Sequence, residues 1–299
     1  MADTVIETTA LRRSYGPVDA VRGLDLHVTR GAICGFLGRN GAGKTTTMKM
    51  LLGMTRPTAG SAHVFGLDAA DPSDSVTIRA RTAFVGDDKP LYETMRVSEL
   101  IRFTASFFPG WQRELEDTYV RRFELPLGRE VKKLSRGMRT KLALTLALCR
   151  GAELLILDEP TSGLDPAAAE DVLQALVSQV ARAGTTVFFS SHQLAEVEQI
   201  ADEIVIIDRG RTIVNGPLED VRERFRRIEV VFANEAPAHA FTAPGVVRVI
   251  RSGRVLTVIA SANHQQIVND ARALLPLSTD VVALTLKDIF LESILTEEP

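Results

Sequence analysis

The stretch that decides the fold is GRNGAGKTT, which runs from Gly38 to Thr46. It matches the pattern G-x-x-x-x-G-K-[ST], whose fixed positions are Gly38, Gly43, Lys44 and Thr45. The apolar run AICGFL (32–37) comes directly before it, and the helix-forming run TTTMKMLLGM (45–54) overlaps its end. A strand, a glycine-rich turn and a helix in this order are the context that a phosphate-binding loop requires.

The chemistry of this loop favours a nucleoside triphosphate. Its glycines let backbone N–H groups close around the β-phosphate, and the helix N-terminus adds a favourable dipole. We expect Lys44 to reach the β- and γ-phosphates and the Thr45 hydroxyl to ligate Mg²⁺. The alternative is a glycine-rich turn with a surface lysine, which the flanking strand and helix make the weaker interpretation. The residues expected to contact the nucleotide are Gly38, Asn40, Gly41, Ala42, Gly43, Lys44, Thr45 and Thr46.

A second acidic centre lies in ELLILDEP (153–160), which is typical of a buried strand and ends in Asp158 and Glu159. Ligands of open α/β sheets gather at the carboxyl ends of strands. Asp158 is therefore expected to hold Mg²⁺, directly or through water, and Glu159 to orient or deprotonate an attacking water. A pair of acids at a strand exit is common by itself, but a phosphate loop without a magnesium carboxylate would be incomplete.

Short apolar runs alternate with amphipathic segments up to about residue 220, which predicts an α/β domain with a mostly buried sheet. Near-continuous apolar runs suit strands that are covered on both faces. The expected strands are Ala32–Leu37, Arg81–Val85, Leu154–Leu157, Thr186–Phe189 and Ile204–Ile207. From about residue 90 to 140 the spacing becomes helical, as in VSELIRFTASFF and RELEDTYVRRF, so we expect a helical insertion there.

A small α+β accessory domain is expected over residues 221–299. VVRVIRSGRVLTVIA (246–260) predicts a hairpin that turns at Ser252 and Gly253. HQQIVNDARALL (264–275) is typical of a helix, DVVALTL (280–286) of a strand and KDIFLESIL (287–295) of a closing helix. Dimerisation, regulation and packing against the core remain equally open as its role.

The bulk composition is that of an ordinary globular chain: 299 residues, 45% hydrophobic and 24% charged. A net charge of −3 gives no general attraction to nucleic acid or anionic lipid, so no nucleic acid is expected as a partner. The start MADTVIETTA lacks the regions of a signal peptide, and no apolar run is long enough to span a bilayer. Cys34 and Cys149 have apolar neighbours, so two buried free thiols are expected rather than a disulfide.

KKLSRGMRTKLALTLAL (132–148) is unusual because a polar, glycine-containing entry leads into a helix that is apolar almost all round. One explanation is a cap, in which Ser135 accepts from the first free amides and Gly137 eases the turn. The other is that the helix start binds an anion, since free N–H groups and the helix dipole favour negative charge there. The segment by itself favours the cap.

Five motifs occur in the order GRNGAGKTT, LSRGM, LLILDEP, SGLD and SSH, and with them the chain resembles the ATP-binding subunits of ABC transporters. The likeness covers roughly residues 5–220, including the helical insertion. It implies a P-loop NTPase core of the α/β class with an antiparallel β region, and ATP and Mg²⁺ as cofactors. It also implies that two chains, identical or related, close head to tail around two ATP molecules. Such a dimer would serve an integral membrane transporter subunit from the cytoplasmic face of the membrane.

The resemblance assigns further site residues. Ser135 and the Gly137 amide would bind the γ-phosphate held by the other subunit, so the anion interpretation wins over the simple cap. Tyr15 would stack on adenine, with a plain surface tyrosine as the alternative. Asp165 would link the two active sites and also cap a helix, and His192 would contact the γ-phosphate from a strand end. The expected catalytic residues are thus Lys44, Glu159 and His192.

Two motifs depart from the family pattern. In LSRGM, Arg136 replaces the first of two glycines and Met138 replaces a glutamine; we expect Arg136 to point to solvent and Met138 to leave the backbone contacts intact. In FVGDDKP (84–90), Asp87 or Asp88 stands where the family has a magnesium-binding glutamine. We prefer Asp87. Its carboxylate can still bind Mg²⁺, yet its charge near the triphosphate predicts slower hydrolysis or an altered metal preference. The expected metal ligands are Thr45, Asp158 and Asp87.

The leading interpretation is therefore an ATPase that powers a membrane transporter by ATP-driven dimer closure, with a coupling helix received near Phe84–Tyr92. A soluble ABC-type ATPase is one alternative, and a nucleotide-sensing regulator without transport is another. Soluble relatives typically carry two fused ATPase units or long coiled coils, and neither occurs in this sequence. The retained catalytic residues argue against a decayed site.

Overall fold

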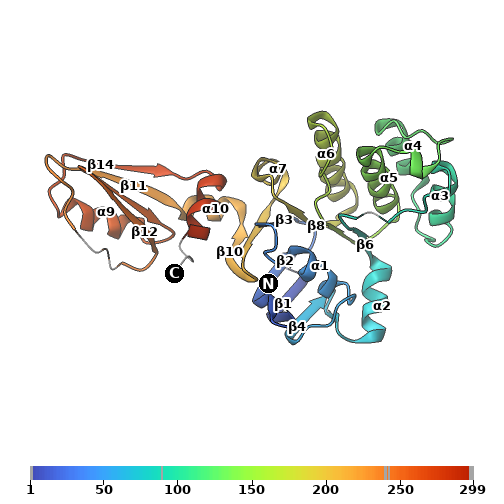
Figure 1. Cartoon of the computed structure of the whole chain (residues 1–299), viewed down its shortest axis with the longest axis horizontal. Coiled ribbons are helices and arrows are strands. Elements are labelled where there is room, and N and C mark those ends of the chain that lie inside the picture. Colours follow the sequence, from blue (N-terminus) through green and yellow to red (C-terminus); the bar gives the residue numbers. More distant parts are fainter. Residues whose placement is uncertain (1–2, 89, 239–240, 242, 296–299) are drawn as a thin grey trace. The chain divides into compact units, whose positions relative to one another are not determined.

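The computed structural model describes residues 3–88, 90–238, 241 and 243–295. The chain divides into two compact units, Met1–Thr212 and Ile213–Pro299, whose elements are labelled in Figure 1. The division falls within strand β10 (Arg211–Pro217), whereas the boundary expected at residue 220 lies inside helix α8 (Leu218–Arg224). The functional meaning of that boundary stays a prediction.

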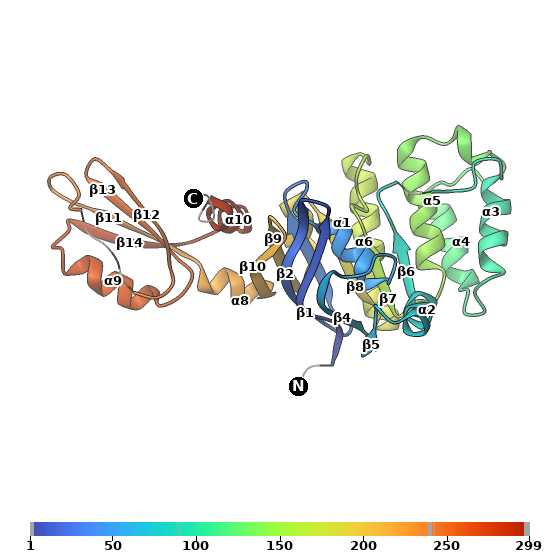
Figure 2. The ribbon, with the colours of Figure 1, turned by 60° about the horizontal axis from the view of Figure 1, so that its bottom comes forward.

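An antiparallel sheet in the order β2-β1-β4-β5 opens the first unit. Its strands are β1 (Thr4–Tyr15), β2 (Val18–Thr29), β4 (Ala59–Val64) and β5 (Leu67–Asp68). Every second residue near the end of β2 is buried, as a strand with one face on a core requires. Its buried residues join one core cluster with Phe36 and Met48, so this sheet packs beside α1 (Lys44–Leu51), the helix that follows the phosphate-binding loop (Figure 2).

A six-stranded sheet in the order β10-β9-β3-β8-β7-β6 carries the site. Besides β10, its strands are β3 (Ile33–Gly38), β6 (Thr82–Val85), β7 (Leu154–Leu157), β8 (Thr186–Ser191) and β9 (Glu203–Asp208). β3, β6, β7, β8 and β9 pair in parallel. All five predicted strands are confirmed, with ends that differ by at most two residues. The parallel arrangement brings their carboxyl ends to one edge.

Seven α-helices are described in the first unit. They are α1 (Lys44–Leu51), α2 (Pro72–Arg81), α3 (Val97–Ala105), α4 (Arg113–Arg122), α5 (Arg136–Leu148), α6 (Pro166–Ala183) and α7 (Leu194–Ile200). The helical insertion comprises α3, α4, the short 3-10 turn Val131–Lys133 and α5. These helices lie together beside the β6 edge of the six-stranded sheet in Figure 1. In the described residues, no helix is both long and apolar enough to cross a membrane.

The second unit contains a four-stranded antiparallel sheet in the order β12-β13-β11-β14. Its elements are α8, β11 (Arg226–Val231), β12 (Val246–Ser252), β13 (Val255–Ala260), α9 (His264–Arg272), β14 (Ser278–Ala283) and α10 (Leu286–Leu295). The predicted hairpin is confirmed, but Ser252 still pairs with Val255, so the turn is at Gly253 and Arg254. Both predicted helices are confirmed, although α9 ends at Arg272, before the expected end at Leu275. The predicted strand 280–286 ends early, because Thr285 and Asp288 exchange hydrogen bonds that start α10.

Candidate active site

The phosphate-binding loop lies between β3 and α1, and its backbone needs glycine. Gly41 and Gly43 have φ angles of 83° and 106°, which residues with a Cβ rarely adopt. A Cβ on Gly43 would lie 2.5 Å from the Ala20 carbonyl oxygen, and one on Gly38 would lie 2.6 Å from that of Ile207. Because no Cβ fits at these positions, backbone N–H groups rather than side chains surround the space for the phosphate.

The Lys44 ammonium is held across this loop. Its Nζ donates to the Gly38 carbonyl at 2.7 Å and lies 3.8 Å from Glu159 Oε1. Burial lowers the pKa of Lys44, and the neighbouring Glu159 and Asp158 carboxylates oppose that change. The Lys44 side chain is 8% exposed, so its charge acts in a poorly screened setting.

Asp158 joins the loop to the sheet. The Thr45 hydroxyl donates to its Oδ2 at 2.5 Å, and the Ser190 hydroxyl donates to its Oδ1 at 2.7 Å. Carboxylate and hydroxyl oxygens are the donors that Mg²⁺ prefers, so these residues fit that ion. Over the described part of the chain, no group of three His, Cys, Asp or Glu side chains could hold a metal by itself. A bound ion therefore needs further oxygens from nucleotide or water.

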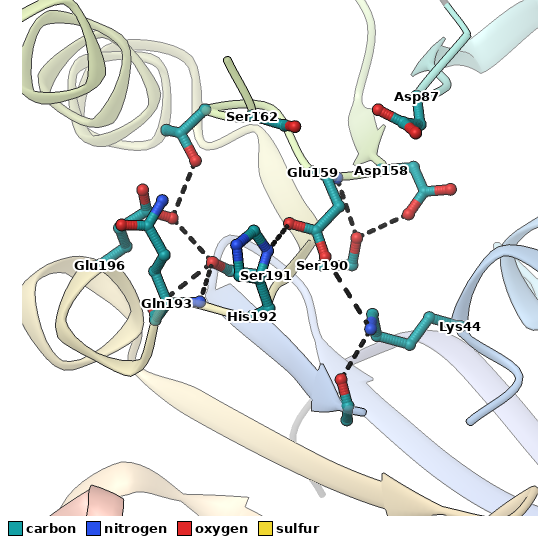
Figure 3. A network of polar contacts seen from close by, with 12 residues as sticks. Lys44, Asp87, Asp158, Glu159, Ser162, Ser190, Ser191, His192, Gln193 and Glu196 are labelled. Atoms are coloured by element: carbon teal, nitrogen blue, oxygen red, sulfur yellow. Dashed lines mark hydrogen bonds and ion pairs between the residues drawn. The ribbon is translucent and has the colours of Figure 1, made fainter. Parts of the chain in front are cut away.

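Glu159 and His192 meet at the ends of neighbouring parallel strands. Glu159 Oε2 lies 2.6 Å from His192 Nδ1, and the Glu159 N–H donates to the Ser190 hydroxyl at 2.9 Å. Glu159 has a φ of 51°, a left-handed conformation that a non-glycine residue keeps only where its surroundings hold it. Figure 3 shows its carboxylate between His192 and Lys44.

Ser135 and Gly137 lie at the start of α5. The Ser135 hydroxyl accepts from the Met138 N–H at 3.2 Å, which confirms the cap. The expectation that Gly137 eases the turn is wrong, because Gly137 lies in the first helical turn and its φ is not positive. A Cβ there would instead lie 3.3 Å from Leu164 Cδ2, so the glycine serves close packing against the SGLD segment.

Arg136 has partners that the sequence did not indicate. Its Nη2 lies 3.6 Å from Asp87 Oδ1 and donates to the Ser162 hydroxyl at 3.2 Å. The side chain is 67% exposed, so it does reach solvent, yet it also spans two other motifs. Two of the three departures from the family pattern, Arg136 and Asp87, thus form an ion pair.

A pocket of about 620 Å³ lies between the sheet and the helical insertion. Thr45, Asp87 and Asp158 are among the residues that line it, so all three expected metal ligands border the same space. The rest of its wall is largely apolar and includes Phe84, Val85, Pro90, Leu91, Phe108, Ala143, Leu146 and Ala147. Most of the segment Phe84–Tyr92 therefore borders a groove.

Tyr15 and Asp165 lie at other parts of the unit. Tyr15 ends β1 with 46% of its surface exposed, and the Arg13 guanidinium lies 4.4 Å from its ring centroid. This cation–π contact covers one face of the ring. Asp165 caps α6 by accepting from the Ala168 N–H at 2.9 Å, which confirms its predicted capping role.

Sequence reasoning missed four polar residues around the site: Arg13, Ser190, Ser191 and Glu196. The signal for the two serines was available, since both lie in the SSH motif at the end of a buried strand. A serine in that position has a hydroxyl that must find a partner. Glu196 carried a weaker signal as an acidic residue on an otherwise apolar helix face.

Known proteins of similar sequence and structure identify the family of this chain. Residues 21–162 match the family model described as "ABC transporter". The chain is 36% identical over 228 residues to the bacitracin transport ATP-binding protein BcrA of Bacillus licheniformis, which covers 75% of this chain and 73% of that protein. It is 31% identical, with a TM-score of 0.67, to a solved ATP-binding subunit of an ABC transporter, over 74% of this chain and 92% of that one.

A second solved structure supports the fold alone. It is described as the dimeric post-hydrolysis state of the ATP-binding cassette MJ0796 bound to ADP and Pi, at 19% identity and a TM-score of 0.64. The match covers 71% of this chain and 98% of that one. With these relatives and the geometry above, the chain belongs to the ABC transporter family, as an ATP-binding subunit and ATPase.

Proposed function

We propose that the chain hydrolyses ATP with Lys44, Glu159 and His192 in a head-to-tail dimer, and that dimer closure drives an integral membrane transporter subunit. The observation that carries the proposal is the arrangement of Glu159, whose carboxylate lies 2.6 Å from His192 Nδ1 and 3.8 Å from Lys44 Nζ. A base, a cation and an imidazole thus converge beside a phosphate-binding loop, as phosphoryl transfer to water requires.

Each residue has a role that its environment supports. The loop amides and Lys44 would hold the β- and γ-phosphates, while Thr45 and Asp158 would ligate Mg²⁺, with Asp87 at the same pocket. Mg²⁺ would neutralise charge on the phosphate oxygens. Glu159 would take the proton of the attacking water, and His192 would orient Glu159 and contact the γ-phosphate. The exposed face of Tyr15 would remain for adenine.

The LSRGM segment suits a role toward a second subunit. Ser135 and Gly137 lie at a helix N-terminus, which favours an anion. The phosphate-binding loop of the same chain contacts other residues, among them Glu159 and Asp158. They would therefore complete the γ-phosphate site of another chain, identical or related, and Asp165 would lie where the two sites communicate. The dimeric cassette among the solved structures is consistent with this arrangement.

The groove beside Phe84–Tyr92 suits a membrane partner. Its wall is mostly apolar and its volume of about 620 Å³ can receive side chains of one helix. Thr45 and Asp158 also line the groove, so an occupant would lie close to the proposed metal-binding residues. The chain would then act from the cytoplasmic face of the membrane, as a peripheral subunit. The C-terminal unit has no assigned part in this proposal.

The test is an affinity pull-down from detergent-solubilised membranes with tagged Glu159→Gln chain, in the presence and absence of ATP and Mg²⁺. The variant keeps the shape of Glu159 but lacks its base, so it should accumulate an ATP-bound dimer by size-exclusion chromatography. Recovery of a polytopic membrane protein is the expected result. Recovery of ribosomes, nucleic acid or the chain alone would instead favour a soluble ATPase.

A further inference from the structure

One buried acidic side chain near the site, Glu196 of α7, has no part in the proposed mechanism. It is 7% exposed and lies next to Ser191 in Figure 3. The Thr161 hydroxyl donates to its Oε2 at 2.8 Å, and the Ser191 hydroxyl donates to the same oxygen at 2.7 Å. Thr161 and Ser191 are themselves 2% and 0% exposed. A single buried oxygen therefore joins the turn after β7 to the end of β8.

These two segments carry the reacting pair. Thr161 follows Glu159 by two residues, and Ser191 directly precedes His192. The turn closes through two backbone bonds, from Ser162 N–H to the Glu159 carbonyl and from Leu164 N–H to the Thr161 carbonyl, both 3.1 Å. Because Glu159 has a positive φ, its conformation depends on how firmly this turn is held.

The helix that carries Glu196 is itself closely packed. A Cβ on Gly35 of β3 would lie 2.5 Å from Val197 Cγ1, so the glycine lets α7 approach the sheet closely. Val197 and Ile200 are buried on this contact face. Glu196 is thus presented from a rigid element, which is what a positioning residue needs.

The bridge through Glu196 is separate from the one through Ser190. Ser190 links Asp158 and the Glu159 N–H, while Ser191 links Glu196 and also accepts from the Gln193 N–H at 2.9 Å. Consecutive residues of a strand point to opposite faces, so the two serines tie the acidic turn to β8 from both sides. Loss of either bridge leaves the other to hold the turn alone.

We infer that Glu196 is a positioning residue for ATP hydrolysis: through Thr161 and Ser191 it holds Glu159 and His192 in contact. The inference rests on the proposed function, because it concerns the same reaction. The Glu196 carboxylate accepts hydrogen bonds from Thr161 and Ser191, so its effect on Glu159 and His192 passes through these two hydroxyls.

The test compares three variants in α7. Glu196→Ala removes the acceptor, and a misplaced base should lower kcat by about 100-fold while KM for ATP stays within about threefold. Glu196→Gln keeps one acceptor oxygen and should retain most of kcat, since both hydroxyls donate to a single atom. Gln199→Ala is the matched control, because it removes a hydrogen bond between α7 and Glu170 and should leave kcat unchanged.

A second measurement needs no nucleotide. Amide hydrogen exchange should accelerate in residues 159–165 and 190–194 of Glu196→Ala, and only there. Thr161→Val and Ser191→Ala should each reproduce much of the kcat loss. Combined with Glu196→Ala, neither should lower kcat further, because the three residues act as one unit.

Unchanged kcat and unchanged amide exchange in Glu196→Ala would overturn the inference. The inference would also be overturned if Glu196→Gln lost as much kcat as Glu196→Ala and amide exchange became faster throughout the chain, since that result would indicate general destabilisation. If the wild-type chain hydrolysed no ATP, the proposed function would fail, and the exchange result would still decide the bridge.

Discussion

The two segments expected to contact ATP are held by the chain in different ways. Lys44 lies 3.8 Å from Glu159, and Asp158, which is only 2% exposed, accepts hydrogen bonds from Thr45 and Ser190. The LSRGM segment is ordered by its own helix cap, and Arg136 is 67% exposed. One half of the site is thus organised inside the chain, whereas the other is a helix end stabilised locally.

This difference predicts where substitutions act. Polar contacts in a buried setting are poorly screened and strongly coupled, so removal of one member disturbs the rest. An exposed helix end has weak internal coupling, and its substitutions should matter only when a second chain is present.

The largest effect is expected for Lys44→Ala. The buried cation lies against both the loop carbonyl and Glu159, and loss of a charge at a transferring phosphate should lower kcat/KM by about 10³-fold. Steady-state ATPase kinetics provide the measurement. Lys287→Ala, an exposed lysine on α10, is the charge-matched control and should behave as wild type. A Lys44→Ala chain that kept even a tenth of the activity would contradict the assignment.

A smaller but still large effect is expected for Ser135→Asp. Asp caps helices as well as Ser, so α5 should remain stable, while the new negative charge opposes phosphate and should lower kcat by about 100-fold. Ser135→Asn, a neutral cap, is the control for side-chain size. Thermal melting should separate this effect from Ser135→Ala, which loses the cap and about 1 kcal/mol of stability.

Mixing the two defective chains tests the contrast directly. In a head-to-tail dimer of Lys44→Ala with Ser135→Asp, both substitutions fall in one site and the other site is intact. The mixture should therefore hydrolyse ATP faster than either variant alone. If each chain contained its own complete site, no recovery would occur.

The sequence predicted what local patterns encode. The loop, the buried strands and the acids at 158 and 159 all follow from spacing within about ten residues. The cap by Thr285 and Asp288, which ends β14 early, needed only local chemistry and was still missed. The Glu196 bridge joins residues 35 positions apart, and Ser190 reaches Asp158 over 32. Such contacts depend on which strands are neighbours, so periodicity alone does not reveal them.

A moderate effect is expected from the pair that departs from the family pattern. Asp87→Gln removes negative charge beside Asp158 and should raise kcat a few-fold, while Arg136→Gly leaves the Asp87 charge less neutralised and should lower it a few-fold. The pair is 3.6 Å apart and over half exposed on each side, so its coupling should stay below about 1 kcal/mol. ATPase assays of both single variants and the double variant give this value. Screening predicts that it shrinks at high salt, and additive effects at low salt would show that the two residues do not interact.

The smallest effect concerns the rates at which two thiols are labelled, one in the phosphate-loop half of the site and one in the helix that follows the LSRGM segment. Cys34 lies in β3 below the phosphate loop, and Cys149 caps the end of α5; both are buried and free. Burial raises the pKa of Cys149 to about 12 and that of Cys34 well above its ordinary value. With a pKa near 12, only ~10⁻⁴ of Cys149 is thiolate at pH 8, so labelling of the folded chain must be slow and must accelerate as pH rises.

Local opening should then separate the two thiols. β3 is hydrogen-bonded on both sides, to β8 and β9, whereas Cys149 lies at a helix end, where opening needs less free energy. A thiol-reactive reagent followed by peptide mass spectrometry should therefore modify Cys149 before Cys34. Denaturant should make the two rates equal, since the unfolded chain exposes both. Faster labelling of Cys34 in the folded chain would mean that the phosphate-loop half opens first, and the contrast between an internally organised half and a locally stabilised one would be reversed.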